Sequence, residues 1–223
     1  MKKYFIRDIG VTVLMFCVVC MGFFISEPAL GLAIEDQFTV TQTVTSEISF
    51  STPTTDVVMT PSLGGITGGT SNGTTTVVVL TNNNTGYTMT IKASSSPAMQ
   101  GNTQGSSIPD YTQASTYVPD YTYSVPSGYE FGYSVSASTT SDLAQKFKDN
   151  GSNTCNTGSA DTSGAASCWY GLSTTATSTV LRTTATSASG STSSIYFKLT
   201  INSGSFVVQD TYVATSTLTA TTN

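Results

Sequence analysis

Apolar residues alternate with threonine and serine along most of this chain, and this period of two leaves few ways for it to fold. From Phe38 to Phe50 the apolar side chains occupy even positions, while Thr39, Thr41 and Thr43 fill odd positions. Successive side chains of a β-strand point to opposite faces of its sheet, so the pattern predicts a strand with one buried face. Similar patterns at 74–81, 87–93, 131–137, 180–184, 195–201 and 212–220 predict seven or eight strands in all.

Alternation of apolar and polar residues along a strand is typical of antiparallel sheets with one buried face, whereas strands of a parallel α/β sheet are apolar on both faces. Residues 82–86 tolerate left-handed backbone, so we expect a hairpin between the strands on either side. The chain is therefore predicted to be all-β, an antiparallel β-sandwich of the immunoglobulin-like or jelly-roll-like kind. One short helix is predicted over 142–149, capped by Thr140 or Ser141, with Leu143 and Phe147 on one face.

The N-terminus has the layout of a secretory signal peptide. Lys2, Lys3 and Arg7 precede an apolar run over 9–25, and Gly31-Leu32-Ala33 offers small residues to a signal peptidase. We expect residues 1–33 to be cleaved and residues 34–223 to form a single sandwich domain, secreted or held at the cell surface, with no further membrane span. An uncleaved anchor is the alternative, since this apolar run approaches the length of a membrane span.

Composition excludes several classes of function. The chain has no histidine and only 9% charged residues, and removal of the leader leaves a net charge of about −6. Binding to nucleic acid through basic patches is excluded, as are histidine-ligated metal sites and histidine-dependent catalytic triads. No cofactor is predicted.

Two long polar stretches interrupt the strands, and one of them ends in a cysteine pair. Residues 94–129 form a Tyr- and Pro-containing insertion in which the motif Pro-Asp-Tyr-Thr at 109–112 recurs at 119–122. Residues 150–168 contain Cys155 and Cys168, the only cysteines left after the leader. In an exported chain the pair is predicted to form a structural disulfide that contributes about 3 kcal/mol, with a reactive or metal-binding thiol pair as the alternative.

Trp169 follows the second cysteine directly and has two interpretations. As a core residue it would pack on the disulfide and close one end of the sandwich. As a ligand-binding residue it would join tyrosines in an exposed platform for sugar rings, with nearby carboxylates and amides as hydrogen-bond partners. The residues of this speculative platform are Trp169, Tyr170, Tyr111, Tyr117, Tyr121 and Tyr123, with Asp110, Asp120 and Asn102 beside them.

Two groups of acidic residues are candidates for catalysis or metal binding. Asp110, Asp120 and Glu130 would suit a glycoside hydrolase if they faced one another, as an acid and a base. Asp149, Asp161 and the intervening Asn-rich turn are rich in oxygen ligands, but their spacing departs from a calcium-binding loop. A solvated turn is therefore predicted there, with no metal and no catalytic residue assigned.

Several motifs resemble those of uncharacterised secreted β-sandwich proteins of candidate-phylum (Parcubacteria-type) bacteria. They lie at 61–69, 81–87, 146–151, 168–172 and 210–215. The chain also resembles, less specifically, fimbrial and WxL-type surface sandwiches, although it has no WxL motif. The resemblance implies export and a shared sandwich fold, and brings no catalytic residues or ligand.

These observations predict a non-enzymatic structural or adhesive protein of the cell surface. The alternative is a carbohydrate-binding module, and a glycoside hydrolase is more remote. Expected partners are surface glycans or other surface proteins. Self-association is a further possibility: the strand over 38–50 is expected to pair within its own domain, or else to add to the sheet of a neighbouring copy.

Overall fold

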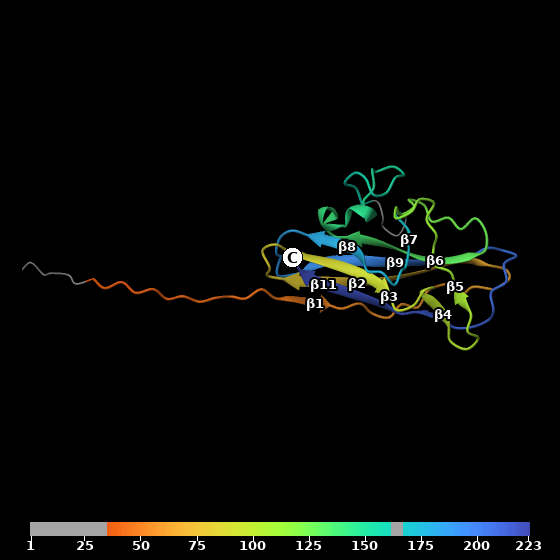
Figure 1. Cartoon of the computed structure of the whole chain (residues 1–223), viewed down its shortest axis with the longest axis horizontal. Coiled ribbons are helices and arrows are strands. Elements are labelled where there is room, and N and C mark those ends of the chain that lie inside the picture. Colours follow the sequence, from red (N-terminus) through yellow and green to blue (C-terminus); the bar gives the residue numbers. More distant parts are fainter. Residues whose placement is uncertain (1–34, 162–166) are drawn as a thin grey trace, which may run out of the picture. The chain divides into compact units, whose positions relative to one another are not determined.

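The computed structural model describes residues 35–161 and 167–223, and these residues form an all-β protein (Figure 1). Contacts divide the chain between Val44 and Thr45, and the unit from Thr45 to Asn223 holds every strand. The predicted antiparallel β-sandwich is confirmed. The predicted signal peptide, residues 1–33, lies outside the described part of the chain.

The first layer of the sandwich is a five-stranded antiparallel sheet. Its central strand β9 pairs with β2 on one side and with β6 on the other. In order across the sheet the strands are β1 (Ile48–Thr52), β2 (Gly69–Thr81), β9 (Ser191–Ile201), β6 (Tyr129–Ala137) and β7 (Tyr170–Gly171).

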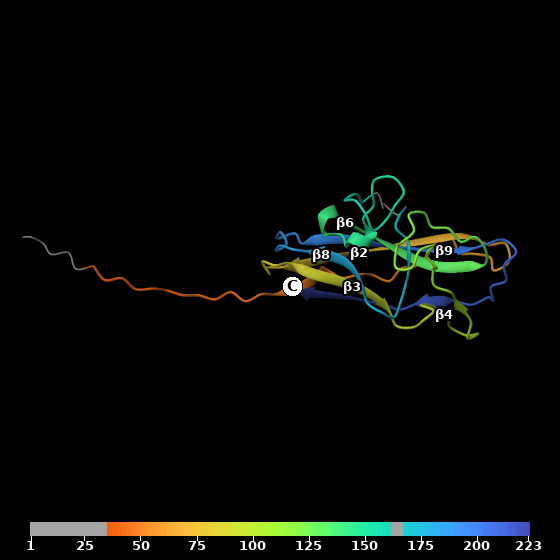
Figure 2. The ribbon, with the colours of Figure 1, turned by 45° about the horizontal axis from the view of Figure 1, so that its top comes forward.

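The second layer consists of two three-stranded antiparallel sheets placed end to end. The first contains β8 (Thr177–Arg182), β3 (Tyr87–Ala93) and β11 (Ser216–Thr222), and the second contains β10 (Tyr212–Ala214), β4 (Met99–Gly101) and β5 (Ser107–Ile108). Because only Thr215 separates β10 from β11, residues 212–222 form one nearly continuous edge, paired first with β4 and then with β3. Figure 2 shows β2, β6 and β9 in one layer and β3 and β4 in the other.

Alternate side chains of the long strands lie on the buried and the exposed faces of the sheets, as the period of two predicts. Along β9 the inward residues Ile195, Leu199 and Ile201 are buried, and they pack with Phe131 and Val135 of β6 in the main core. Hydroxyl groups pair across strands on the other face, as between Thr70 and Thr200, whose Oγ1 atoms lie 2.9 Å apart. Cross-strand pairs of this kind add a modest stabilisation to the buried face.

The turn at 82–86 differs from its prediction. It has the expected left-handed residue, Gly86 at φ +77°, but β2 and β3 do not pair with each other. The chain instead crosses from one layer to the other, because the apolar faces of both strands pack together: Val77 and Val79 lie in one cluster with Tyr87 and Met89. The predicted hairpin is therefore wrong.

The predicted strand over 38–50 is confirmed only at its end. Residues 35–47 have no regular secondary structure, and β1 begins at Ile48. The side chains of Phe38, Val40 and Val44 are 86%, 83% and 81% exposed.

The predicted helix over 142–149 is replaced by two 3₁₀ turns, Thr140–Asp142 and Gln145–Phe147. Between them the backbone is extended, so that the Ala144 N–H donates to the Thr179 carbonyl of β8. Leu143 and Phe147 are buried as expected. An ion pair at 2.5 Å between Arg182 and the buried Asp142 also holds this segment.

The predicted disulfide between Cys155 and Cys168 is present, with Cα atoms 5.6 Å apart. Both half-cystines are buried in the main core cluster. Among the described residues, no helix is apolar and long enough to cross a bilayer.

The structure has eleven strands in its described part, more than the seven or eight predicted. The additional strands are short: β4, β5 and β7 have two or three residues each, and the predicted C-terminal strand is divided into β10 and β11. Elements this short show too little alternation to be recognised in a sequence.

Candidate functional site: an aromatic cluster and a groove between the sheets

The aromatic residues of the predicted sugar platform come together, but as a small second core. Trp169 and Tyr111 are 1% and 3% exposed, and they pack with Val125, Tyr123 and Tyr196. Tyr123 stacks on Tyr111 at a centroid distance of 4.5 Å and meets Trp169 edge to face at 5.3 Å. The insertion thus covers the outer face of the five-stranded sheet.

Two glycines make room for this covering. A Cβ atom on Gly132 of β6 would lie 2.8 Å from Cβ of Tyr111, and one on Gly171 of β7 would lie 2.3 Å from the Tyr111 carbonyl oxygen. The sheet surface is therefore flat where Tyr111 crosses it. Burial removes the faces of Trp169 and Tyr111 from contact with a sugar ring, so these two rings form no exposed platform.

The other predicted platform residues are dispersed. Tyr170 points into the main core, where the Lys146 Nζ lies 4.0 Å from its ring centroid. Tyr121 is half-buried against the same core, and Tyr117 is 76% exposed. Trp169 does not join the disulfide's cluster either; the cysteines and Trp169 belong to different cores.

The carboxylates of the insertion stabilise its fold. Asp120 accepts hydrogen bonds from the Tyr111 hydroxyl at 2.8 Å and from the Ala114 N–H, and its backbone pairs with Trp169. Glu130 accepts a bond from the Thr112 N–H, and desolvation raises the pKa of its carboxyl. Burial and the Asp120 hydrogen bond also raise the pKa of the Tyr111 hydroxyl.

Asp110 belongs to a different part of the structure from Asp120. Its backbone pairs with Phe131, and its carboxylate accepts the Ala98 N–H at 3.0 Å. The two copies of the Pro-Asp-Tyr-Thr repeat therefore both add short pairings to the sheet, while their carboxylates satisfy different backbone donors. The arrangement accounts for these residues structurally and gives no acid–base pair facing an open cleft.

The Asn-rich loop uses its oxygens internally. Asp149 Oδ1 accepts the Gly151 N–H at 2.6 Å, and Asn150 Oδ1 accepts the N–H groups of Ser152, Asn153 and Thr154. Asp161 accepts the Ala137 N–H at 3.2 Å. Among the described residues, no group of three or more His, Cys, Asp or Glu side chains is placed to hold a metal ion.

We expect chelation to leave this loop intact, because its oxygens bond to backbone donors. The melting temperature of residues 34–223 should be the same with EDTA as with added calcium, when both are measured by circular dichroism. A drop of several degrees in EDTA that calcium reverses would instead identify Asp149 and Asp161 as ligands.

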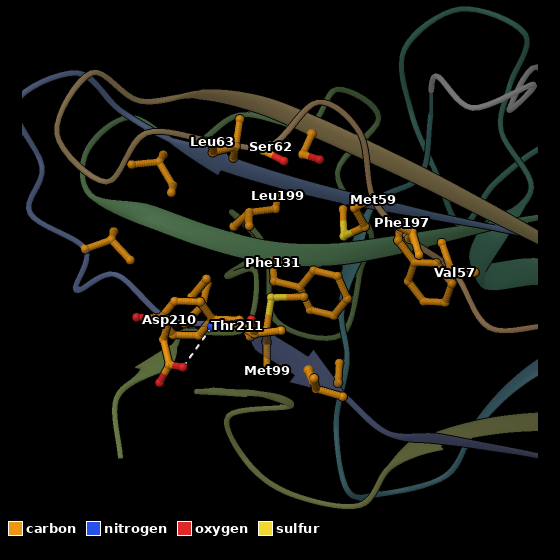
Figure 3. A pocket seen from close by; sticks show the side chains of 18 of the residues that line it. Val57, Met59, Ser62, Leu63, Met99, Phe131, Phe197, Leu199, Asp210 and Thr211 are labelled. Atoms are coloured by element: carbon orange, nitrogen blue, oxygen red, sulfur yellow. Dashed lines mark hydrogen bonds between the residues drawn. The ribbon is translucent and has the colours of Figure 1, made fainter. Parts of the chain in front are cut away.

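A large groove of mixed polarity, which the sequence did not predict, lies between the two layers, and its floor is formed by residues of the main core. Its volume is about 1190 Å³. Figure 3 shows the side chains of Phe131, Leu199 and Met99 turned into it, and the Phe131 and Phe197 rings stack there at a centroid distance of 5.9 Å. The residues that border it along the chain are 54–66 on one side and 206–216 on the other.

The groove exists because the layers close at one end and separate at the other. Beside β1, the side chains of Ile48, Leu218 and Ala220 all pack against the second buried cluster, which contains Val77 and Met89. Beyond β1 the chain runs alongside β2 without forming a strand. The Thr55 N–H donates a hydrogen bond to the Thr75 hydroxyl, and an isolated β-bridge joins Thr60 to Asn72. Side chains of Val58, Ile66, Phe206, Val208 and Val213 at this end are 40% to 86% exposed.

One wall of the groove is an unpaired sheet edge. Both β10 and β11 are the terminal strands of their sheets, so residues 212–222 use one edge for β4 and β3 and have no strand on the other edge, among the residues described. Such an edge presents unpaired N–H and C=O groups to any extended segment alongside it.

Asp210 fixes the position of this edge at the mouth of the groove (Figure 3). Its carboxylate accepts the N–H groups of Gln104, Thr103 and Thr211. These donors lower the pKa of the exposed Asp210 carboxyl from 3.8 to about 2.

The lowered pKa predicts a specific pH dependence. Since the folded pKa lies below the unfolded value, the Asp210 contribution is complete above about pH 5 and is lost as pH falls from 4 toward 2. The difference in unfolding free energy between wild type and Asp210→Asn should shrink over that interval, as measured by urea denaturation. Thr103→Val, which keeps the backbone donors, should retain most of the pH dependence; a pH-independent difference would show that the carboxylate does not hold these donors.

No family model, curated protein or solved structure matches this chain. What the chain does must therefore be argued from its own residues.

Proposed function

We propose that this chain is an exported, non-enzymatic structural or adhesive protein of the cell surface, and that it acts by binding through the groove between its sheets. The observation that carries the proposal is a groove bordered by exposed aliphatic and aromatic side chains and by a strand edge that is unpaired among the described residues. Exposed apolar patches on folded domains mark interaction sites.

Four further features support export and a surface role. The Cys155–Cys168 disulfide fits an oxidising compartment. The leader-like N-terminus and the resemblance to secreted and fimbrial sandwiches favour the same location. A β-sandwich with hydroxyl-bearing outer faces is a rigid unit that suits a load-bearing surface layer.

A carbohydrate-binding module remains a less favoured alternative. Its proposed rings Trp169 and Tyr111 are buried, and the Asp120 carboxylate is occupied by Tyr111 and Ala114. A glycoside hydrolase is disfavoured for a related reason, since Asp110 and Asp120 each satisfy backbone donors in separate places.

The location is tested by expressing the full chain with its own leader in a bacterial host. Antibodies against the Thr45–Asn223 unit should label intact cells or the medium, and the matched variant without residues 1–33 should be detected only after lysis. Retention of both forms inside the cell would contradict the proposal, as would a glycan array with specific, saturable binding, which would favour the carbohydrate-binding alternative.

A further inference from the structure

We propose that β11 is the contact surface of a symmetric dimer, in which it pairs edge to edge and antiparallel with β11 of a second copy of this chain. The proposal goes beyond the proposed function, because it depends neither on export nor on binding in the groove. The groove runs along β10 and meets β11 only at Ser216 and Leu218. The inference rests on a difference between β11 and the other strands that end a sheet.

The strands that end the three sheets are β1, β7, β10, β5, β11 and β8. Natural sheets protect such edges by short strands, by bulges, by charges or proline, or by a covering segment. β5, β7 and β10 have only two or three residues each, and the register of β1 shifts at residues 50–52. β8 is covered by residues 143–144, which form a bridge to Val180 and donate a hydrogen bond to the Thr179 carbonyl. Each of these five edges is therefore protected.

β11 is the exception among these edges. Its seven residues pair with β3 along their whole length, without a register shift. It contains no charged residue, no proline and no glycine. No isolated bridge joins it to another described segment. A regular, uncharged edge of this length is a template for pairing with a further strand.

Hydrogen bonds at the two ends of β11 show which of its backbone groups point away from β3. At one end the Ser94 N–H donates to the Thr215 carbonyl. At the other end the Asn223 N–H donates to the Gly86 carbonyl. Alternate residues of an antiparallel strand direct their N–H and C=O groups to the same neighbour, so the odd-numbered residues bond to β3. The outward groups belong to Ser216, Leu218, Ala220 and Thr222.

A two-fold axis at Thr219 brings the outward groups of two copies together. With Thr219 opposite itself, Leu218 lies opposite Ala220, and Ser216 lies opposite Thr222. Each of these is a hydrogen-bonded pair, in which two residues exchange both of their backbone bonds. The register uses the whole of β11, and every outward N–H finds a carbonyl of the other copy.

The side chains of β11 are compatible with this register. Thr217, Thr219 and Thr221 are exposed on the outer face, where hydroxyl pairs across strands stabilise a sheet. On the inner face Leu218 and Ala220 pack against the buried clusters of their own copy, and the large side chain of one copy lies beside the small side chain of the other. No like charges meet. The edge is therefore complementary to itself, which favours a second copy over an unrelated strand.

The dimer joins two three-stranded sheets into one, in the order β8, β3, β11, β11, β3, β8. Both ends of the joined sheet are β8 strands, whose edges residues 143–144 already cover. The same surface is used on both copies, so the contact closes at two copies and gives no filament. A contact limited to one strand edge is small, and we expect a dimer that dissociates on dilution.

Dimerisation is tested by analytical ultracentrifugation of residues 34–223 over a range of concentrations. We expect a monomer–dimer equilibrium for the wild type. Thr219→Lys places two like charges opposite each other on the axis, and it should raise the dissociation constant at least about tenfold. The matched control is Thr90→Lys, because Thr90 is the partner of Thr219 on β3 and lies on the same face, one strand away from the edge. It should leave the dissociation constant nearly unchanged.

The two-fold register is tested by complementation. Thr219→Lys and Thr219→Asp should each weaken the dimer when alone, because position 219 then meets its own charge. An equimolar mixture of the two variants should dimerise again, since opposite charges meet on the axis.

Cysteine scanning tests the same register by a covalent readout. Thr219→Cys should give an interchain disulfide on mild oxidation, because a pair on the axis that is not hydrogen-bonded holds its side chains within the reach of a disulfide. Thr217→Cys and Thr221→Cys lie exposed on the same face of the same strand. Each should give no such link alone, since position 217 lies opposite position 221.

The inference fails if the wild type is monomeric at every concentration. It also fails if Thr219→Lys and Thr90→Lys dimerise equally well, because the interface then lies elsewhere. Equal interchain disulfides from positions 217, 219 and 221 would contradict the register and show random collision. All of these measurements use purified protein, so a negative outcome leaves the proposed surface location standing.

Discussion

Replacement of Trp169 by alanine should cost about 3–5 kcal/mol of unfolding free energy, the range for a fully buried large aromatic residue. Trp169 is 1% exposed, and it is the centre of the contact between the insertion and the outer face of the sheet. Its loss also removes the ring over which the Lys198 Nζ lies, 4.3 Å from the centroid. Urea denaturation followed by circular dichroism measures the change.

Tyr117 is the matched control, because it belongs to the same insertion but is 76% exposed. Tyr117→Ala should change the unfolding free energy by no more than about 0.5 kcal/mol. If Trp169→Ala were as mild as Tyr117→Ala, the second core would not exist, and Trp169 would again be a candidate for ligand binding.

Removal of the disulfide should cost about 3 kcal/mol, the loop-closure value for a loop of this size. The two cysteines are 13 residues apart in the sequence and are buried with Phe147 and Leu143 in the main core. The variant Cys155→Ala/Cys168→Ala avoids a buried polar group at either position. We expect its denaturation midpoint to fall.

A reductant provides the internal control for this prediction. Dithiothreitol should lower the stability of the wild type to about that of the double variant, and it should leave the double variant unchanged. A wild-type chain as stable when fully reduced, with both thiols confirmed by mass spectrometry, would contradict a structural role for the Cys155–Cys168 bond.

The long strands were predictable because alternation is a local property of the sequence. Phe131, Val135, Ile195 and Leu199 were all assigned to buried faces by period alone, and the structure places them there. The disulfide was predictable because Cys155 and Cys168 are the only cysteines outside residues 1–33, so only one pairing exists. The prediction of a helix was wrong because the spacing of Leu143 and Phe147 is compatible both with a helix and with a pair of 3₁₀ turns.

The sites were harder to predict, since they depend on which layer each strand joins. The insertion covers the face of the five-stranded sheet opposite the main core, and no pattern in the sequence indicates this. Because of that covering, Trp169 is buried in a different core from the two cysteines. The groove arises from segments without alternation. The apolar runs Val57-Val58-Met59 and Phe206-Val207-Val208 were visible in the sequence, but only the fold brings them to one cavity.

The most direct measurement of the proposed surface location combines protease accessibility with the redox state of the two cysteines in cells that express the full chain with its own leader. Proteinase K is added to intact cells, and free thiols are alkylated before lysis and reduction. We predict that the protease digests the Thr45–Asn223 unit without lysis and that Cys155 and Cys168 are not alkylated, because they form a disulfide. A unit that is protected until lysis, with both thiols alkylated, would contradict the account.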